Sequence, residues 1–450
     1  MGKIFGTDGI RCVVNTEPLT AETTLKISKT VGYLLNSKNI NNSRVIICKD
    51  TRLSGYLYEP LITAGFISMG MEVILVGPLP TPAVPHLMRT LRANIGVMIT
   101  ASHNTYEYNG IKFFNLDGFK ISSKLEKEIE TIVLNKKKYS KILNSNNKTG
   151  KAIRLEDASG RYSEFLKSTL NKNIKTKKLK IVLDCGNGAT YDIAPSIFWE
   201  LGHQVVSINN KPNGKNINYN CGAVNVDSLC KKVVEEKADI GFAFDGDGDR
   251  LIVVDDKGNE IDGDKIIALF AKYLINKKKT NSKFPVVTSV MSNLGLENFL
   301  LKDLGIKLKR SAVGDINVIQ EMKKYKSFLG GEQSGHIILS DFSKTGDGIL
   351  AALKITEIIS IIKKSTSYIF DLYDNFPQIK INISYTKISE KNKKNLKVLN
   401  KKNSKDKKIR VLIRLSGTEP LIRILVEGQN LEKVQQKAKI LEAEIRKEIG

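Results

Sequence analysis

Short apolar runs alternate with amphipathic helical patterns in the N-terminal part of the chain. Runs of strand length occur at Ser43–Cys48, Glu72–Val76 and Ile95–Ile99, and turn residues bound them. A helical pattern fills the gap from Tyr58 to Met69. This alternation is typical of βαβ units, and it predicts a mainly parallel sheet with helices on both faces.

The same alternation returns twice further along the chain. A second α/β segment has strand-like runs at Lys180–Asp184 and Ile240–Phe244. A third begins near Asp264, contains a strand at Pro285–Val290, and ends in a helix at Asp347–Ile362. The chain therefore repeats α/β units without a visible sequence repeat.

The C-terminal part has a different pattern. It begins near Asp371, with strands at Lys408–Arg414 and Leu421–Val426 and an amphipathic helix from Leu431, which predicts a small α+β domain. Because 450 residues are too many for one hydrophobic core, several domains are expected. We predict four, with the boundaries 1–150, 151–255, 256–370 and 371–450.

The composition is that of a globular protein outside the membrane. Apolar residues make up 41% of the chain, and no apolar run reaches the length of a transmembrane helix. A turn and a carboxylate at Phe5–Gly9 occupy the place of a signal-peptide core, so we predict a cytoplasmic protein without membrane association. The five cysteines are odd in number and form no C-x-x-C pair, which argues against disulfides and zinc.

The net charge of +24 raises nucleic acid as a partner. Much of this charge lies in Lys-rich stretches with few aromatic residues, such as Lys136–Lys138 and Lys391–Lys394, which are typical of solvated loops and helix faces. No nucleic-acid-binding motif accompanies them. We therefore expect no specific nucleic-acid partner, although a basic field attracts small anions.

Ser102 follows directly on the predicted strand Ile95–Ile99, within Thr100-Ala-Ser-His-Asn104. Open α/β sheets bind ligands at such strand ends, and the small neighbours leave the hydroxyl accessible. The alternative is that Ser102 and Asn104 only form the turn. Three further motifs favour a phosphorylated serine, because each supplies a part that it needs.

The first motif places three carboxylates at alternate positions after the strand Ile240–Phe244, with glycines between them: Asp245, Asp247 and Asp249. Three carboxylates repel one another and need a cation, and hard oxygen ligands select Mg²⁺ or Ca²⁺. An EF-hand does not fit, because Arg250 takes the glycine position and Asp256 the final glutamate position. A capped acidic turn is the remaining alternative. A phosphate on Ser102 would supply a further ligand.

The second motif, Arg414-Leu-Ser-Gly-Thr-Glu-Pro-Leu-Ile-Arg423, lies between two predicted strands. Its hydroxyls, backbone N–H groups and two guanidiniums can converge on a phosphate, which an arginine fork binds through two oxygens. An ordinary hairpin loop explains Gly417 and Pro420 but not the two arginines.

The third motif, Gly330-Gly-Glu-Gln-Ser-Gly-His336, separates two short predicted strands. Glu332 and Ser334 can bind neighbouring hydroxyls of a sugar. A tight turn with exposed polar residues is the alternative, and His336 alone could be a structural histidine.

Together these motifs resemble the α-D-phosphohexomutase family over nearly the whole chain and in the family's order. Thr100–Asn104 with Asn109–Lys112 is similar to the phosphoserine loop of that family, and Gly331–His336 and Phe5–Arg11 resemble its phosphoglucosamine mutase branch. The resemblance implies an α/β fold: three related α/β domains with mixed sheets and a smaller C-terminal α+β domain around a central cleft.

The resemblance also implies an activity. It implies that phosphorylated Ser102 interconverts glucosamine 6-phosphate and glucosamine 1-phosphate through a glucosamine 1,6-bisphosphate intermediate, feeding the synthesis of UDP-N-acetylglucosamine and cell-wall precursors. One Mg²⁺ per active site would bind Ser102 and the three aspartates. Phosphomannomutase or phosphoglucomutase activity is the nearest alternative. A sugar-phosphate-binding protein without catalytic activity is a further alternative. The oligomeric state stays open, and a homodimer is one possibility.

The resemblance assigns roles to further residues. Lys112 matches the family's proton-transfer or charge-stabilising lysine, and Arg11 and Arg250 add positive charge around the phosphoryl group. The remaining residues contact the sugar (Glu332, Ser334 and His336) or the non-transferring phosphate (Arg414, Ser416, Gly417, Thr418 and Arg423). Three positions depart from the family pattern: Cys12 replaces Gly, Thr105 replaces Pro, and Ile316 replaces Arg. These departures leave open how rigid the serine loop is and which residues contact the sugar near residue 316.

Overall fold

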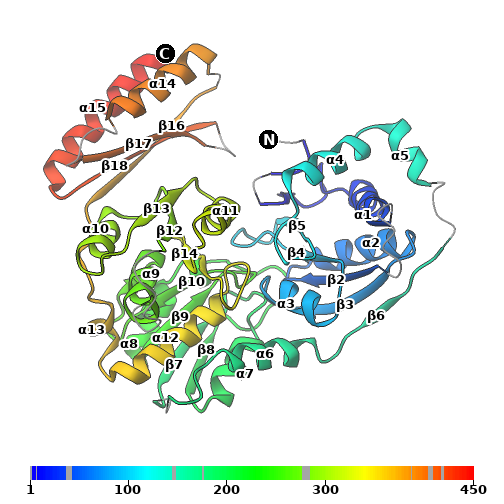
Figure 1. Ribbon diagram of the computed structural model, residues 1–450, viewed down its shortest axis with the longest axis horizontal. Helices are drawn as coiled ribbons and strands as arrows, with labels where there is room; N and C mark the ends of the chain where they lie inside the picture. The colour runs from blue at the N-terminus through cyan, green and yellow to red at the C-terminus, as the bar shows by residue number, and fades with distance from the viewer. Residues whose placement is uncertain are drawn as a thin grey trace. The chain divides into compact units, whose positions relative to one another are not determined.

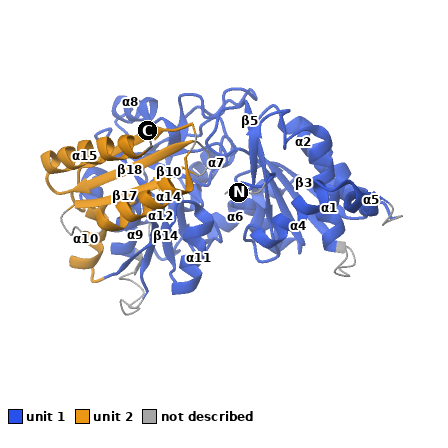
Figure 2. Cartoon of the chain, turned by 90° about the horizontal axis from the view of Figure 1, so that it is seen from above, with its two compact units in different colours: residues 1–291, 306–371 blue, residues 292–305, 372–450 orange. Residues whose placement is uncertain are grey.

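A computed structural model describes residues 3–6, 8–36, 43–143, 148–174, 177–275, 284–386, 388–403, 409–416 and 420–449. The chain forms two compact units, which Figure 2 colours separately. The first unit comprises residues 1–291 and 306–371, and the second comprises residues 292–305 and 372–450. Among the described helices, none combines the length and the apolar character needed to cross a membrane.

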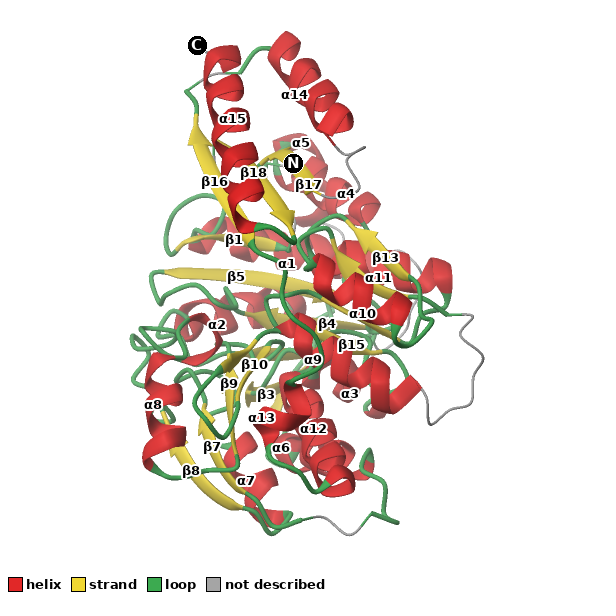
Figure 3. Ribbon diagram, turned by 90° about the vertical axis from the view of Figure 1, so that its left-hand side faces the viewer, coloured by secondary structure: helices red, strands yellow, loops and turns green. Residues whose placement is uncertain are grey.

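The first sheet has six strands in the order β1-β5-β4-β2-β3-β6. They are β1 (Ile10–Val13), β2 (Arg44–Lys49), β3 (Glu72–Pro78), β4 (Ile95–Ile99), β5 (Tyr108–Phe114) and β6 (Ala152–Arg154). Strands β2, β3, β4 and β6 are parallel, as the βαβ pattern predicts. Strand β5 runs antiparallel to its neighbours β1 and β4, and Figure 3 labels these three strands. The sheet is therefore mixed.

Helices cover both faces of this sheet. Helices α1 (Ala21–Asn36) and α2 (Gly55–Ile67) pack with Val45 and Ile47 of β2 in one core. Helix α3 (Ala83–Thr90) contacts β2 and β4 from the other side (Figure 1). Because β2 is buried on both faces, its apolar run is continuous rather than alternating. Helices α4 (Ser123–Val133) and α5 (Lys136–Leu143) complete this part.

The second sheet has five strands in the order β11-β10-β9-β7-β8. They are β7 (Lys180–Asp184), β8 (Gln204–Ile208), β9 (Ile240–Phe244), β10 (Leu251–Val254) and β11 (Glu260–Ile261). Its helices are α6 (Ala158–Ser168), α7 (Ile193–Glu200) and α8 (Asp227–Glu235), with the 3₁₀ turn Gly222–Val224. Strands β9 and β10 form an antiparallel pair around the aspartate loop, so that loop is a hairpin connection.

The third sheet has four strands in the order β13-β12-β14-β15. They are β12 (Val286–Ser289), β13 (Leu308–Ser311), β14 (Leu329–Gly331) and β15 (Ile337–Leu339). Its helices are α9 (Gly263–Phe270), which continues into the π-helical turn Ala271–Ile275, α11 (Asp315–Tyr325), α12 (Gly348–Ile362) and α13 (Thr366–Phe370). The two short strands predicted around the motif at residues 330–336 are confirmed as β14 and β15.

The second compact unit contains a three-stranded antiparallel sheet in the order β16-β18-β17. Its elements are α10 (Leu294–Lys302), β16 (Gln378–Ser384), α14 (Glu390–Asn403), β17 (Ile409–Leu415), β18 (Leu421–Gly428) and α15 (Leu431–Ile449). Helices α14 and α15 lie on the same side of this sheet (Figure 1), where Leu396 and Leu441 share a core with Ile413 and Ile424. The predicted α+β organisation is confirmed, with β16 and α14 as additional elements.

The sheets reach slightly beyond the boundaries that the sequence pattern placed between domains. Strand β6 pairs with β3, so the first sheet continues past residue 150. Strand β11 pairs with β10, so the second sheet continues past residue 255. Both strands are too short to give a period-2 signal of their own, since β6 spans three residues and β11 spans two.

Candidate active site

Ser102 is buried beside the aspartate loop. Its hydroxyl donates to Oδ2 of Asp245 at 2.8 Å. Its backbone adopts a left-handed conformation with φ of 51°, which is unusual for a residue other than glycine. The turn after β4 thus holds Ser102 in a constrained conformation that aims the hydroxyl at a carboxylate from the second sheet.

Arg52 maintains the conformation of this serine loop. Its guanidinium, which is fully buried, uses all five N–H donors. One is paired with Asp50 at 2.8 Å, and the others donate to the backbone carbonyls of Ser102, Asn104, Thr105 and Tyr108. Sequence reasoning missed Arg52, although Asp50-Thr-Arg52 follows β2 at the sheet edge where Ser102 follows β4.

Asn218 and the aspartate loop both pack against the backbone of the serine loop. Asn218 donates to the carbonyls of Ser102 and Asn104 at 2.8 and 2.9 Å. A Cβ atom at Gly246 would lie 2.7 Å from the Ser102 carbonyl oxygen, so this position accepts only glycine. Gly248 has φ of 68°, which allows the backbone to curl between the carboxylates, as the sequence predicts.

The three aspartates form a buried cluster. Asp245, Asp247 and Asp249 each offer an oxygen within 4.8 Å of the others. Among the described residues, Oδ1 of Asp247 and Oδ1 of Asp249 are buried without a hydrogen-bond partner. Burial and the two neighbouring carboxylates raise the pKa of Asp245 well above its ordinary value. A bound cation would relieve this repulsion, so the cluster can hold a metal ion.

Lys112 compensates part of this negative charge. Its Nζ is buried, 2.8 Å from Oδ2 of Asp247 and 3.5 Å from Oδ2 of Asp249. Burial alone would lower the pKa of Lys112, but these aspartates and Asp8 raise it well above the ordinary value. Lys112 therefore places a paired positive charge directly against the aspartate cluster.

The two predicted arginines both contact groups that surround Ser102. Arg11 donates to Oδ1 of Asn104 at 3.2 Å and is paired with Asp8 at 2.6 Å. Nε of Arg250 lies 3.9 Å from both Asp245 and Asp249. Both guanidiniums thus stand near the place where a phosphate on Ser102 would lie.

The loop after β14 joins the aspartate loop through its backbone. Gly335 accepts from the N–H of Leu251 at 2.9 Å, and Arg250 forms a bridge with His336. Nε2 of the buried His336 lies 3.9 Å from Asp249. Glu332 is buried, whereas Ser334 is exposed. The structure therefore brings the candidate sugar-binding loop to the aspartate cluster.

The candidate phosphate-binding motif belongs to the second compact unit. Arg414 of β17 and Arg423 of β18 are directly paired across the sheet. Burial and the positive charge of Arg423 lower the pKa of Arg414, as expected for two crowded cations that an anion would stabilise. Ser416 closes the strand pair by donating to the carbonyl of Leu421 at 2.7 Å. Gly417 and Thr418 lie outside the described residues.

The sequence matches four family models over most of its length. These are the phosphoglucomutase/phosphomannomutase α/β/α domain I at residues 2–140, domain II at 160–258, domain III at 262–376 and the C-terminal domain at 386–444. The chain belongs to the phosphoglucomutase/phosphomannomutase family. The predicted architecture of three α/β domains and a smaller C-terminal domain is thereby confirmed.

Family members of known name and structure are similar to this chain. A phosphoglucosamine mutase from Thermodesulfovibrio yellowstonii is 46% identical over 449 residues, covering 98% of each chain. The crystal structure of a phosphoglucomutase/phosphomannomutase family protein from Burkholderia thailandensis has a TM-score of 0.81 at 22% identity, covering 99% of this chain and 98% of the other. An N-acetylphosphoglucosamine mutase from Aspergillus fumigatus, in complex with GlcNAc-6P and magnesium, has a TM-score of 0.63 at 16% identity, covering 99% of this chain and 96% of the other.

The three residues that depart from the family pattern have defined surroundings in the structure. Thr105 lacks the rigidity of proline, but its carbonyl is held by Arg52. Cys12 lies half-buried in β1, with its Sγ 3.5 Å from the carbonyl oxygen of Thr16. Ile316 lines a cavity of about 860 Å³ together with Phe5, Gly6 and residues of α4. Among these three positions, Thr105 is thus restrained by a hydrogen bond from Arg52.

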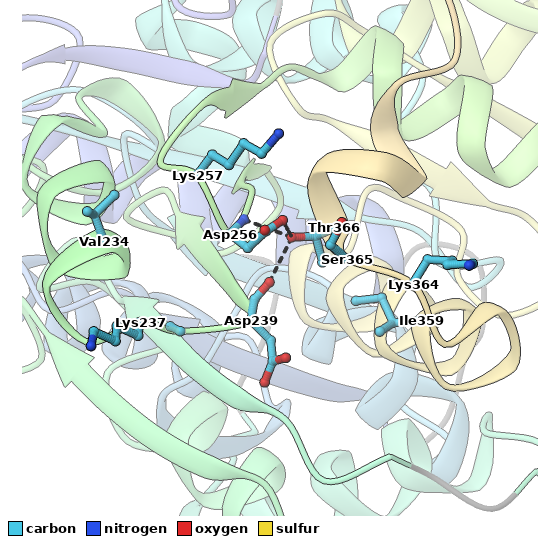
Figure 4. Close-up of a pocket in the computed structure, with 10 residues that line it drawn as sticks. Val234, Lys237, Asp239, Asp256, Lys257, Ile359, Lys364, Ser365 and Thr366 are labelled. Carbon is cyan, nitrogen blue, oxygen red and sulfur yellow. Dashed lines mark hydrogen bonds between the residues drawn. The ribbon is translucent and has the colours of Figure 1, made fainter.

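A second cavity, of about 510 Å³, is lined by none of the three aspartates, and Figure 4 shows the residues that line it. Its centre is polar, because the Thr366 hydroxyl bonds to the Asp256 carboxylate and the Asp239 carbonyl. Lys237, Lys257 and Lys364 line it, but their amino groups point in different directions (Figure 4). This cavity therefore lacks the converging charges that a phosphate group needs.

Proposed function

We propose that this chain is a phosphoglucosamine mutase, which interconverts glucosamine 6-phosphate and glucosamine 1-phosphate. The observation that carries the proposal is the position of Ser102, whose Oγ lies 2.8 Å from Asp245 of the buried cluster. The 46% identity over nearly the whole chain to a protein of that name supports the choice of sugar.

In the proposed reaction, Ser102 carries the phosphoryl group. A hydroxyl oxygen of the sugar attacks phosphorus and the bond to the Ser102 oxygen breaks. The sugar hydroxyl gives up its proton and the departing Ser102 oxygen takes one up, so that glucosamine 1,6-bisphosphate and free Ser102 form. The bisphosphate then reorients, and Ser102 takes back the other phosphoryl group. Charged Lys112, Arg11 and Arg250 stabilise the negative charge of the transferring group, which is the main task in loose phosphoryl transfer.

We propose one Mg²⁺ per site, held by Asp245, Asp247 and Asp249 together with the phosphate on Ser102. The all-oxygen donor set and the two unpartnered carboxylate oxygens support this choice. When bound, Mg²⁺ would neutralise charge on the phosphoryl group. Lys112 keeps Asp247 ionised for this purpose: burial alone would raise the pKa of Asp247, but the ion pair with Lys112 and the hydrogen bond from Thr81 lower it.

Substrate contacts complete the proposal. Glu332, Ser334 and His336 bind hydroxyls of the sugar, and Arg414, Ser416, Gly417, Thr418 and Arg423 bind the phosphate that is not transferred. The paired guanidiniums of β17 and β18 support the second assignment. We further propose that the protein acts in the cytoplasm on a small sugar phosphate, without a specific nucleic-acid or membrane partner, and that a homodimer is one form to test.

Competition kinetics with glucosamine, glucose and mannose phosphates test the choice of sugar. We expect the highest kcat/KM for glucosamine phosphate. The preference over glucose phosphate should be below about tenfold, because an exposed contact to the ammonium group contributes about 1 kcal/mol or less. Equal or faster use of glucose 1-phosphate would move this chain to the phosphoglucomutase branch, and absence of turnover with all three would favour a binding protein.

A further inference from the structure

A lysine outside the predicted site connects the serine-bearing sheet to the sugar-binding loop. Lys120 follows the turn after β5, and its side chain is only 7% exposed. Its Nζ contacts two carboxylates, Asp8 from the N-terminal segment and Asp315, the latter at 2.5 Å. Buried charges of this kind are costly unless they are paired, so this arrangement depends on all three groups being present.

The turn before Lys120 fixes its position. Oδ1 of Asn115 accepts from the N–H groups of Asp117 and Phe119 at 3.0 and 3.1 Å. The Phe119 ring packs against α11, with Nζ of Lys323 at 3.2 Å from the ring centroid. The turn therefore docks on α11, and Lys120 reaches the first residue of that helix.

The segment that Lys120 holds is also the segment that orients Glu332. Asp315 begins α11, and the N–H of the preceding Gly314 donates to Oε1 of Glu332 at 3.0 Å. One oxygen of Asp315 accepts from the N–H of Ile316 at 2.8 Å, and the other faces Lys120. The position of the Glu332 carboxylate thus depends on a backbone segment that is anchored through Asp315.

The other partner of Lys120 leads to the phosphoryl-transfer groups. Asp8 is paired with Arg11 at 2.6 Å and lies 3.5 Å from Lys112. Lys112 in turn contacts Asp247 at 2.8 Å. A continuous set of ion pairs therefore runs from the aspartate cluster through Asp8 and Lys120 to the start of α11.

We propose that Lys120 is a positioning residue that sets Glu332 relative to the transfer site by linking Asp8 to Asp315. Without its ammonium group, Asp8 and Asp315 would face each other as like charges and the Gly314–Asp315 segment would move away. Lys120 acts through Glu332 and does not itself contact the substrate. This inference rests on the proposed mutase function only for its kinetic consequence.

The kinetic test compares Lys120→Met with Lys120→Arg, Glu332→Gln and the double variant Lys120→Met/Glu332→Gln. We expect Lys120→Met to raise KM for the sugar phosphate at least fivefold, and Lys120→Arg to recover most of the loss. The double variant should be no worse than the more impaired single variant, because both changes remove the same contact. Lys124→Met, an exposed position on α4, is the matched control and should behave as wild type. An unchanged KM in Lys120→Met, or strictly additive losses in the double variant, would overturn the proposal.

A second readout does not depend on turnover. Amide hydrogen exchange in a peptide covering residues 312–317 should be faster in Lys120→Met than in wild type, because the Gly314 N–H loses its fixed acceptor. Equal exchange would refute the inference even if the protein proves inactive on glucosamine phosphate. If Lys120→Met does not fold, Asp315→Asn, which keeps the size of the side chain, is judged by the same exchange and KM criteria.

Discussion

The hydroxyl of Ser102 donates to Oδ2 of Asp245 at 2.8 Å, although 143 positions separate the two residues in the chain. One residue follows a strand of the first sheet and the other follows a strand of the second. Their contact joins a candidate phosphate carrier to a candidate metal cluster. The expectations for phosphoryl transfer depend on that contact and on the groups that maintain it.

The first prediction concerns Ser102 itself. Ser102→Ala removes the oxygen that would carry the phosphoryl group, so turnover of glucosamine phosphate should fall at least about a thousandfold. The melting temperature should change little, because the substitution removes one hydroxyl and leaves the backbone contacts of the loop in place. Initial rates and thermal melts of the purified variant are the measurements, and full activity in this variant would refute the covalent role.

The second prediction concerns Arg52. Lysine keeps the charge but provides three donors from a single point, so Arg52→Lys cannot reach the four carbonyls that the guanidinium holds. We expect kcat to fall at least about tenfold, because small displacements of reacting groups are costly. Arg154→Lys, at an exposed position, is the matched control. A wild-type kcat in the folded Arg52→Lys variant would show that the serine loop keeps its conformation without the Arg52 guanidinium.

The third prediction concerns the metal. Chelation should stop the wild-type reaction, and added Mg²⁺ should restore it. Asp247→Asn removes one of three carboxylates, so Mg²⁺ binding should weaken at least about tenfold, since ligand charge sets the affinity of such sites. Calorimetric titration with Mg²⁺ measures the affinity, with Asp192→Asn at an exposed position as the control. Unaltered activity after exhaustive chelation would contradict the proposed cofactor.

The fourth prediction concerns the dependence of stability on pH. His86 stacks on Phe165 with ring centroids 4.3 Å apart, and burial together with the nearby Arg89 lowers its pKa from 6.5 to about 4. The unfolded chain therefore binds a proton between these values while the folded protein does not. The free energy of unfolding should fall as the pH drops from 6.5 to about 4, by on the order of 1 kcal/mol for this partly exposed side chain.

Denaturant unfolding at pH 7 and pH 5 measures this effect. His86→Gln should reduce the difference between the two pH values, even if the variant is less stable at both. An identical pH dependence in wild type and His86→Gln would show that His86 does not contribute to it.

The sequence predicted those parts of the site that are contiguous in the chain. The strand before Ser102 and the strand before Asp245 were evident from buried apolar runs, and the spacing of the three carboxylates indicated a cation. Each of these signals lies within about ten residues. The structure confirms the strands and brings the three carboxylates together beside the serine.

Residues that act across long distances in sequence could not be predicted in this way. Arg52 binds carbonyls 50 to 56 positions away, and Lys120 pairs with Asp315 across 195 positions. Nothing near a lysine or an arginine in the chain shows which carboxylate or carbonyl it will meet after folding. Strand β16 is a different case, because Ile379, Ile381 and Ile383 alternate with polar residues and give a local period-2 signal, although no strand was predicted there.

Phosphopeptide mapping during turnover tests the central claim most directly. The protein is treated with a sugar 1,6-bisphosphate whose phosphates carry an isotopic label, the labelled phosphate is located by mass spectrometry, and unlabelled glucosamine 6-phosphate is then added. We predict a single labelled phosphate on Ser102, which passes to glucosamine 1,6-bisphosphate and glucosamine 1-phosphate while Ser102 regains an unlabelled phosphate. A phosphate on another residue, or a label that stays on Ser102 while product forms, would contradict the account.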